Sequence, residues 1–93
     1  MYVGAIHTIR DATAWAETMR NLGPDSFPVG LELLATGTSQ DVDRAICLWR
    51  APSVEQLHTT LDEIAGQIAV NDCFGVSDEF TSVVGQSPQA TTA

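Results

Sequence analysis

The sequence predicts one small α+β domain with the element order β-α-β-β-α-β, and three observations support this fold class. Residues 12–22 and 54–68 repeat apolar side chains at the helical spacing of about 3.6 residues. Ninety-three residues are enough for one domain and too few for two. Short apolar segments rich in β-branched or aromatic residues are typical of strands. Such segments cover residues 1–9, 29–36, 45–50 and 69–76.

The first helix is marked at both ends. Asp11 directly precedes it and can accept hydrogen bonds from the free amides of the first turn. Gly23 and Pro24 follow it, and both residue types stop helices. We therefore expect a loop over residues 24–28. The apolar stripe of this helix consists of Ala12, Trp15, Ala16, Met19 and Leu22.

The second half of the chain carries similar signals. The polar segment from Gly37 to Asp41 predicts a hairpin turn between the second and third strands. Ser53 and Gln56 have the spacing of a capping box at the start of the second helix. We expect the folded domain to cover residues 1–80 and a flexible, largely uncharged tail to follow over residues 81–93.

This element order is that of a ferredoxin-like fold, with a four-stranded antiparallel sheet and two helices on one face. The other face is then open, and polar residues are expected there. The strands do not alternate in that way, since Ile46 and Leu48 oppose Cys47 and Trp49. An apolar open face is an association surface, and a two-fold homodimer covers it. The alternative is a monomer whose tail covers that face.

Charge and cysteine usage exclude several partners and compartments. The chain has 4 basic and 12 acidic residues, a net charge of −8 and no lysine, which argues against nucleic acid and anionic membranes as partners. No apolar run approaches the ~20 residues of a membrane span. Residues 1–10 lack a signal-peptide pattern, and Cys47 and Cys73 form no CxxC pair. We expect a cytoplasmic protein with free thiols.

The segment Ala45-Ile46-Cys47-Leu48-Trp49-Arg50-Ala51-Pro52-Ser53 resembles the strand-to-helix junction of a family of small ferredoxin-like proteins that includes a nickel-binding member. In plan, the whole chain resembles the dimeric α/β-barrel superfamily. That resemblance implies a two-fold dimer formed through the open sheet face. The superfamily contains monooxygenases, isomerases, cyclases, haem-degrading enzymes and ligand binders, so the resemblance does not choose a function. The nickel-binding relative coordinates mainly through histidines, and His7 and His58 do not map onto its pattern.

His7 is the leading candidate for chemistry, because an imidazole within an apolar strand can act as a general base, a metal ligand or a ligand-orienting donor. The alternative is a core histidine with a satisfied hydrogen bond. Gly4 would let a helix approach the backbone, so we expect the even-numbered face of the first strand to lie under the helices. His7, with Val3 and Ala5, would then line a cavity toward the dimer interior.

Four further residues are candidate ligand contacts. Trp49 either stacks on a flat ligand or fills the core. Cys47 and Cys73 could join His7 in a soft metal site, but no closely spaced ligand pair supports this, and the favoured interpretation is that they are small buried hydrophobes. Glu32 either pairs with His7 or is an exposed edge-strand charge. We assign no metal site.

The function that these residues favour is a small dimeric binding protein, which holds a small, partly apolar or aromatic molecule in a sheet-lined cavity. A cofactor-independent monooxygenase, isomerase or cyclase is the alternative, with His7 as its catalytic residue. A metal-binding or structural protein is a further alternative. No motif predicts a cofactor.

Overall fold

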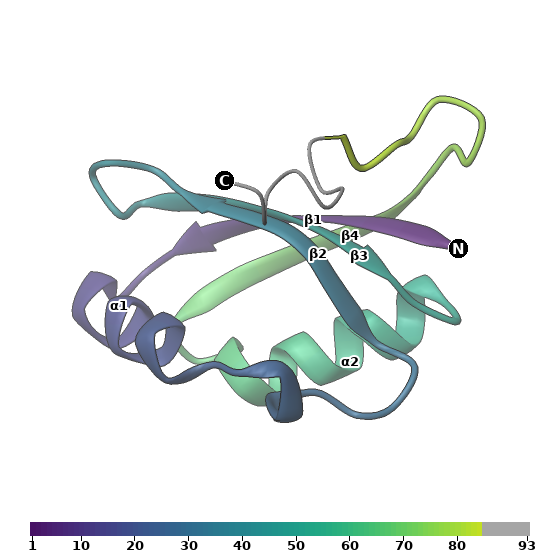
Figure 1. Ribbon diagram of the computed structural model, residues 1–93. Helices are drawn as coiled ribbons and strands as arrows, with labels where there is room; N and C mark the ends of the chain where they lie inside the picture. The colour runs from purple at the N-terminus through teal and green to yellow at the C-terminus, as the bar shows by residue number, and fades with distance from the viewer. Residues whose placement is uncertain (85–93) are drawn as a thin grey trace, which may run out of the picture.

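The computed structural model describes residues 1–84 and confirms the ferredoxin-like α+β fold (Figure 1). The predicted tail beyond residue 84 lies outside the described residues. Two helices are present, α1 (Ala12–Asn21) and α2 (Val54–Ala65), with a short 3-10 turn, η1 (Pro24–Ser26). The strands are β1 (Tyr2–Ile9), β2 (Glu32–Thr38), β3 (Arg44–Arg50) and β4 (Ala69–Val76).

One antiparallel sheet holds the four strands in the order β2-β3-β1-β4. Both helices lie on the same side of it, below the sheet in Figure 1. Because β1 lies between β3 and β4, its residues from Tyr2 to Thr8 each have a neighbour on both sides. Ala5 lies opposite Cys47 and Cys73, and His7 lies opposite Ala45 and Asn71. This register brings the candidate residues of three strands together.

Both helices have the predicted N-cap, but of the predicted capping box at Ser53 and Gln56 only the bond to the Ser53 hydroxyl is present. Asp11 Oδ1 accepts a hydrogen bond from the Ala14 amide at 3.0 Å, and Ser53 Oγ accepts one from the Gln56 amide at 3.1 Å. At its other end α2 stops at Ala65 rather than at residue 68, because Gly66 caps it and the chain then turns into β4.

The second strand is displaced from its predicted position along the sequence. It begins at Glu32 rather than at residue 29, because Gly30 has a φ of +99° and turns the chain, while Val29 is fully exposed. It continues to Thr38, since the Ser39 side chain organises the turn. Ser39 Oγ accepts from the amides of Asp43 and Arg44 at 3.1 Å each. The hairpin turn therefore follows residue 38 instead of beginning at residue 37.

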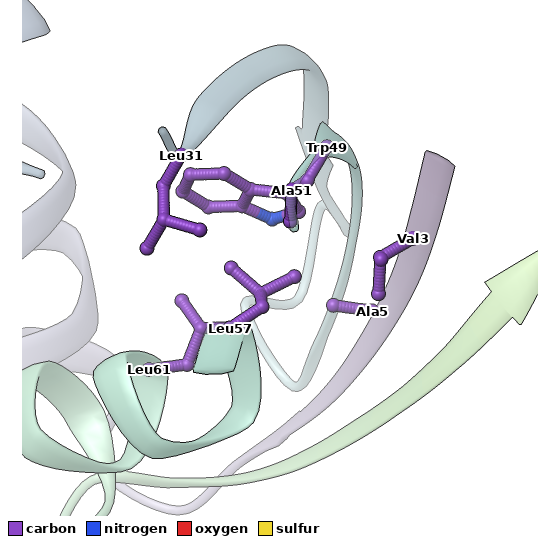
Figure 2. Packing of buried hydrophobic residues seen from close by; sticks show 7 residues of the cluster. All are labelled: Val3, Ala5, Leu31, Trp49, Ala51, Leu57 and Leu61. Atoms are coloured by element: carbon purple, nitrogen blue, oxygen red, sulfur yellow. The ribbon is translucent and has the colours of Figure 1, made fainter. Parts of the chain in front are cut away.

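The hydrophobic core lies between the sheet and the helices. Figure 2 shows seven buried residues of its larger cluster, in which Trp49 packs near Leu31 and Leu57. A second cluster includes Ile9, Trp15 and Ala45.

The odd-numbered face of β1 turns toward the helices, so the predicted assignment of the two faces was wrong. The reason is the role of Gly4. A Cβ on Gly4 would lie 2.9 Å from the ring of Phe74 on the neighbouring strand β4. The glycine thus makes room for an aromatic side chain on the open face, and not for a helix.

Candidate functional site between the sheet and the helices

His7 is buried under α1, with only 2% of its surface exposed. Its ring centroid lies 5.1 Å from that of Trp15. The expectation that His7 faces a dimer interior is therefore wrong, because the imidazole lies on the helix side of the sheet. A buried imidazole needs hydrogen-bond partners, and the structure provides one for each ring nitrogen.

A chain of hydrogen bonds runs through His7 from β2 to α2. Asn71 Nδ2 donates to Asp62 Oδ1 at 3.0 Å, which turns the amide oxygen of Asn71 toward His7. His7 Nδ1 lies 2.7 Å from Asn71 Oδ1 and is therefore the donor. His7 Nε2 lies 3.2 Å from Cys47 Sγ, and Thr36 Oγ1 lies 3.3 Å from the same sulfur. We call these five residues the polar chain.

The directions of these bonds follow from the neutral imidazole. Because His7 donates through Nδ1, Nε2 is free to accept the thiol proton of Cys47. The sulfur then accepts from the Thr36 hydroxyl. Each proton of the polar chain thus has one acceptor, and the thiol hydrogen points at an imidazole nitrogen.

Burial keeps both central groups of the polar chain neutral. It lowers the pKa of His7, and the hydrogen bond to Asn71 offsets this only in part. Burial also raises the pKa of the Cys47 thiol, against smaller opposing effects of Thr36 and the Trp49 indole. At neutral pH the pair is therefore a thiol and an uncharged imidazole.

Cys73 lies outside the polar chain. Burial, and after it the charges of Asp62 and Asp72, raise its pKa to about 11. Cys47 and Cys73 are free thiols on the two strands that flank Ala5. Their Cα atoms are thus two strand spacings apart, roughly 10 Å. A disulfide requires less than about 7 Å, so these two residues cannot form one without rearranging the sheet.

A small cavity of about 30 Å³ adjoins the polar chain. Its wall includes Trp15, Phe27, Thr36, Cys47, Trp49 and Leu61. Among residues 1–84, the buried indole Nε1 of Trp49 is the one buried side-chain nitrogen or oxygen that has no hydrogen-bond partner. It lies near enough to Cys47 to lower the thiol pKa, yet no acceptor meets the geometry of a hydrogen bond with it. Trp15 differs, because its Nε1 donates to Thr38 Oγ1 at 3.2 Å.

A groove of about 450 Å³ lies next to this cavity, where the loop after α1 meets the start of β2. Three residues border both spaces, namely Leu22, Phe27 and Leu33. The Phe27 ring packs edge-on against Trp49 with its centroid 4.8 Å away. Phe27 is half-buried and borders both the groove and the cavity.

Glu32 is remote from His7. Its carboxylate pairs with Arg50 at 2.9 Å, and Arg50 lies over the ring of Tyr2. The paired register of these strands puts Glu32 on the open face, so the carboxylate–imidazole pair considered from the sequence does not form. Glu32 is an exposed charge on an edge strand, where charge discourages pairing with other chains.

The open face carries exposed apolar side chains from three strands. They are Ile6, Ile46, Val70 and Phe74, and we call them the open-face patch. Ile46 is the most exposed of them, at 63%. Ile46 and Leu48, which flank Cys47 on β3, lie on this face, whereas Cys47 itself points to the helices.

Sequence reasoning missed Asn71, Thr36 and Phe27. Asn71 had a detectable signal, because it is a polar residue within an apolar strand and shares the odd-numbered parity of Cys73. Antiparallel pairing of β1 with β4 then places it beside His7. Phe27 had no such signal, since it lies in a loop.

Comparison with known proteins finds no matching family model, no matching curated protein and no matching solved structure. Within residues 1–84, no group of three or more His, Cys, Asp and Glu side chains is placed to hold a metal ion. Neither helix described there is long and apolar enough to cross a membrane.

Proposed function

We propose that this domain binds a small, partly aromatic molecule between its sheet and its helices, and that the molecule accepts a hydrogen bond from Trp49. The observation that carries the proposal is the buried indole N–H of Trp49, which has no partner among residues 1–84. Leaving a buried donor unpaired costs about 1–3 kcal/mol. An acceptor on a bound ligand would remove this cost, which favours a ligand with a carbonyl or a similar oxygen.

The aromatic and apolar wall of the cavity favours a ligand that is aromatic, mostly apolar and uncharged. Trp15, Phe27 and Trp49 offer ring faces and edges for stacking. Cys47 and Thr36 are the polar residues of the wall, and neither carries a charge. A mostly apolar pocket with a few polar anchors is the usual composition of a small-molecule site. A strongly charged ligand would lose its hydration without gaining an ionic partner.

Ligand entry requires Phe27 to move. The cavity of about 30 Å³ has room for little more than water, whereas a space of roughly 150 Å³ is needed for one benzene ring. The adjoining groove of about 450 Å³ lies in the range of ligand pockets. Rotation of Phe27 away from Trp49 would join the two spaces, so the proposed ligand takes the place of the Phe27 ring.

The same proposal includes a cytoplasmic homodimer that pairs through the open-face patch. Exposed apolar side chains on three adjacent strands support the pairing, because such patches are association surfaces. Two free thiols support a reducing compartment. The net charge of −8 supports a partner that is neither nucleic acid nor an anionic membrane.

The indole N–H resonances in a ¹H–¹⁵N spectrum test ligand binding directly. The chain has two tryptophans, and a Trp15→Phe variant assigns their two signals. Acetophenone should shift the Trp49 signal strongly and the Trp15 signal little, because Trp15 already donates to Thr38. Ethylbenzene lacks the carbonyl oxygen and should bind at least several-fold more weakly. Equal affinity for the two probes, or no shift at the Trp49 signal, would contradict the proposal.

A pair of loop variants tests the entry route. Phe27→Ala should raise the association rate of acetophenone, because it removes a ring that borders both the groove and the cavity. Val29→Ala is the matched control, since Val29 lies in the same loop and is fully exposed. It should leave the rate unchanged.

A further inference from the structure

Cys47, His7 and Asn71 are arranged in the order that nucleophilic catalysis requires. The thiol sulfur lies 3.2 Å from one imidazole nitrogen, and the other nitrogen lies 2.7 Å from an amide oxygen. A nucleophile, a base within hydrogen-bonding reach and a third group that orients the base are the signature of an activated nucleophile. The same order of thiol, imidazole and amide serves in cysteine proteases on unrelated folds.

A second, independent observation is the unpartnered indole of Trp49. It is 2% exposed, and both Trp49 and Cys47 border the cavity. The two residues are neighbours on the same face of β3, one pleat apart. An N–H donor without an acceptor beside a nucleophile is what a developing oxyanion needs.

We infer that Cys47 is the nucleophile of an acyl-transfer site that accepts small, uncharged, apolar acyl esters or thioesters. In this site His7 acts as the general base, Asn71 is the positioning residue and Trp49 is the oxyanion donor. The inference rests on the proposed function, because the acyl compound must enter the same cavity. It adds a covalent step to what would otherwise be reversible binding.

The first step forms an acyl-cysteine. Cys47 Sγ attacks the carbonyl carbon while its proton passes to His7 Nε2, to which the thiol already points. Trp49 Nε1 donates to the carbonyl oxygen as it becomes negative. The bond from carbon to the leaving oxygen or sulfur then breaks, and His7 returns the proton to that leaving group. The products are acyl-Cys47 and a free alcohol or thiol, with the protein neutral again.

The second step restores the thiol. His7 Nε2 accepts a proton from water as the water oxygen attacks the acyl carbon. The carbon–sulfur bond breaks, a carboxylic acid leaves, and Cys47 takes the proton back from His7. Throughout, Asn71 Oδ1 accepts from His7 Nδ1, which keeps Nε2 directed at the sulfur. Asp62 holds the Asn71 amide in that orientation.

Acetylation by 4-nitrophenyl acetate tests the inference. Nitrophenolate release gives the rate, and mass spectrometry of peptides gives the site. In samples stopped before the second step restores the thiol, we expect one acetyl group per chain, on Cys47. Cys73→Ala is the matched control and should react like the unchanged protein, because Cys73 lies outside the polar chain. His7→Gln should slow acetylation of Cys47 about 100-fold or more, the range that a positioned base contributes.

The pH profile separates base catalysis from reaction of a free thiolate. Titratable groups on the elements packed around His7 include Cys47 on β3, Cys73 on β4 and Asp62 on α2, which reaches it through Asn71. With His7 as base, the rate should rise as His7 loses its proton below pH 6.5 and should be level at neutral pH. Asn71→Ala should change this profile as well as the rate.

Three results would overturn the inference. The first is acetylation of Cys47 that is no faster than that of Cys73, and the second is an acetylation rate that His7→Gln leaves unchanged. The third is a rate that climbs steadily through neutral pH toward the raised thiol pKa of Cys47. Acetophenone binding, followed at the Trp49 signal in each variant, shows that the variant is folded and that the cavity is accessible. Binding without acetylation would remove this inference and leave the proposed function standing, whereas loss of both would remove both.

Discussion

His7 satisfies two partners at once, Asn71 through Nδ1 and Cys47 through Nε2. Replacing it with Phe keeps an aromatic ring under Trp15 but leaves the Asn71 oxygen buried without its donor. We expect His7→Phe to lower the free energy of unfolding by about 1–3 kcal/mol in urea titrations. Thr59→Phe is the control, because Thr59 is exposed on α2, and it should change stability by less than about 0.5 kcal/mol. Equal effects would contradict the hydrogen-bonded role of His7.

The lowered pKa of His7 also predicts how stability depends on pH. In the unfolded chain His7 takes up a proton near pH 6.5, whereas burial in the folded chain resists that proton. The unfolded state therefore binds more protons as the pH falls below 6.5, and the stability due to neutral His7 is lost through the folded pKa. Thermal unfolding should show this loss in the unchanged protein and a smaller one in His7→Phe. Parallel pH profiles would contradict it.

At the residue scale the sequence identified four of the residues that lie beneath the helices, but it assigned the face of His7 to the wrong side of the sheet. The register pairs odd-numbered residues of β1 with odd-numbered residues of β3 and β4, so these residues lie on one face of the sheet. That face holds His7, Cys47, Trp49 and Cys73. Parity alone does not say which face the helices cover. That choice depended on Gly4, whose missing side chain is matched by Phe74, far away in the sequence.

The end of α2 allows a test at the scale of one element. A Cβ on Gly66 would meet the backbone carbonyl of Asp62, which a neighbouring side chain cannot relieve by moving. Gly66→Ala should therefore destabilise the protein by about 1–3 kcal/mol. At Gly23 nothing lies within 4 Å of the added atom, so Gly23→Ala is the control. Urea titrations of the two variants that give the same free energy of unfolding would contradict this account of the helix end.

Element types were predictable from periodicity and caps, whereas the second strand was displaced. Asp11 and Ser53 mark the starts of the two helices, because their side chains accept hydrogen bonds from amides that the first turn leaves free. The C-terminal end of β2 depends on Ser39, whose side chain bonds to residues on the other side of the turn. Such bonds set the position of the turn, and the turn preferences of the residue types do not predict them.

At the scale of the whole molecule, a homodimer through the open-face patch is the predicted assembly. Sedimentation at micromolar concentration should show a dimer for the unchanged protein. Ile46→Lys should give a monomer, because it places a charge within the patch on a central strand. Val29→Lys adds the same charge at a fully exposed loop residue and should remain dimeric. A monomeric unchanged protein, or a dimeric Ile46→Lys variant, would contradict this assembly.

The layered architecture explains why the candidate site lies where it does. Right-handed crossovers put both helices on one face of the sheet. This face carries four members of the polar chain, and the fifth, Asp62, reaches them from helix α2. The sequence predicted the layers from element order. It did not predict the cavity, because the cavity depends on how Phe27 from a loop meets Trp49 from the sheet.

The central claim is that ligand binds between the sheet and the helices, and not on the open face. Intermolecular nuclear Overhauser effects from the methyl group of bound acetophenone test this claim most directly. The account predicts effects to Trp49, Leu61 and Phe27, which border the cavity. Effects to Ile6, Ile46 and Phe74 instead would place the ligand on the open face and contradict it.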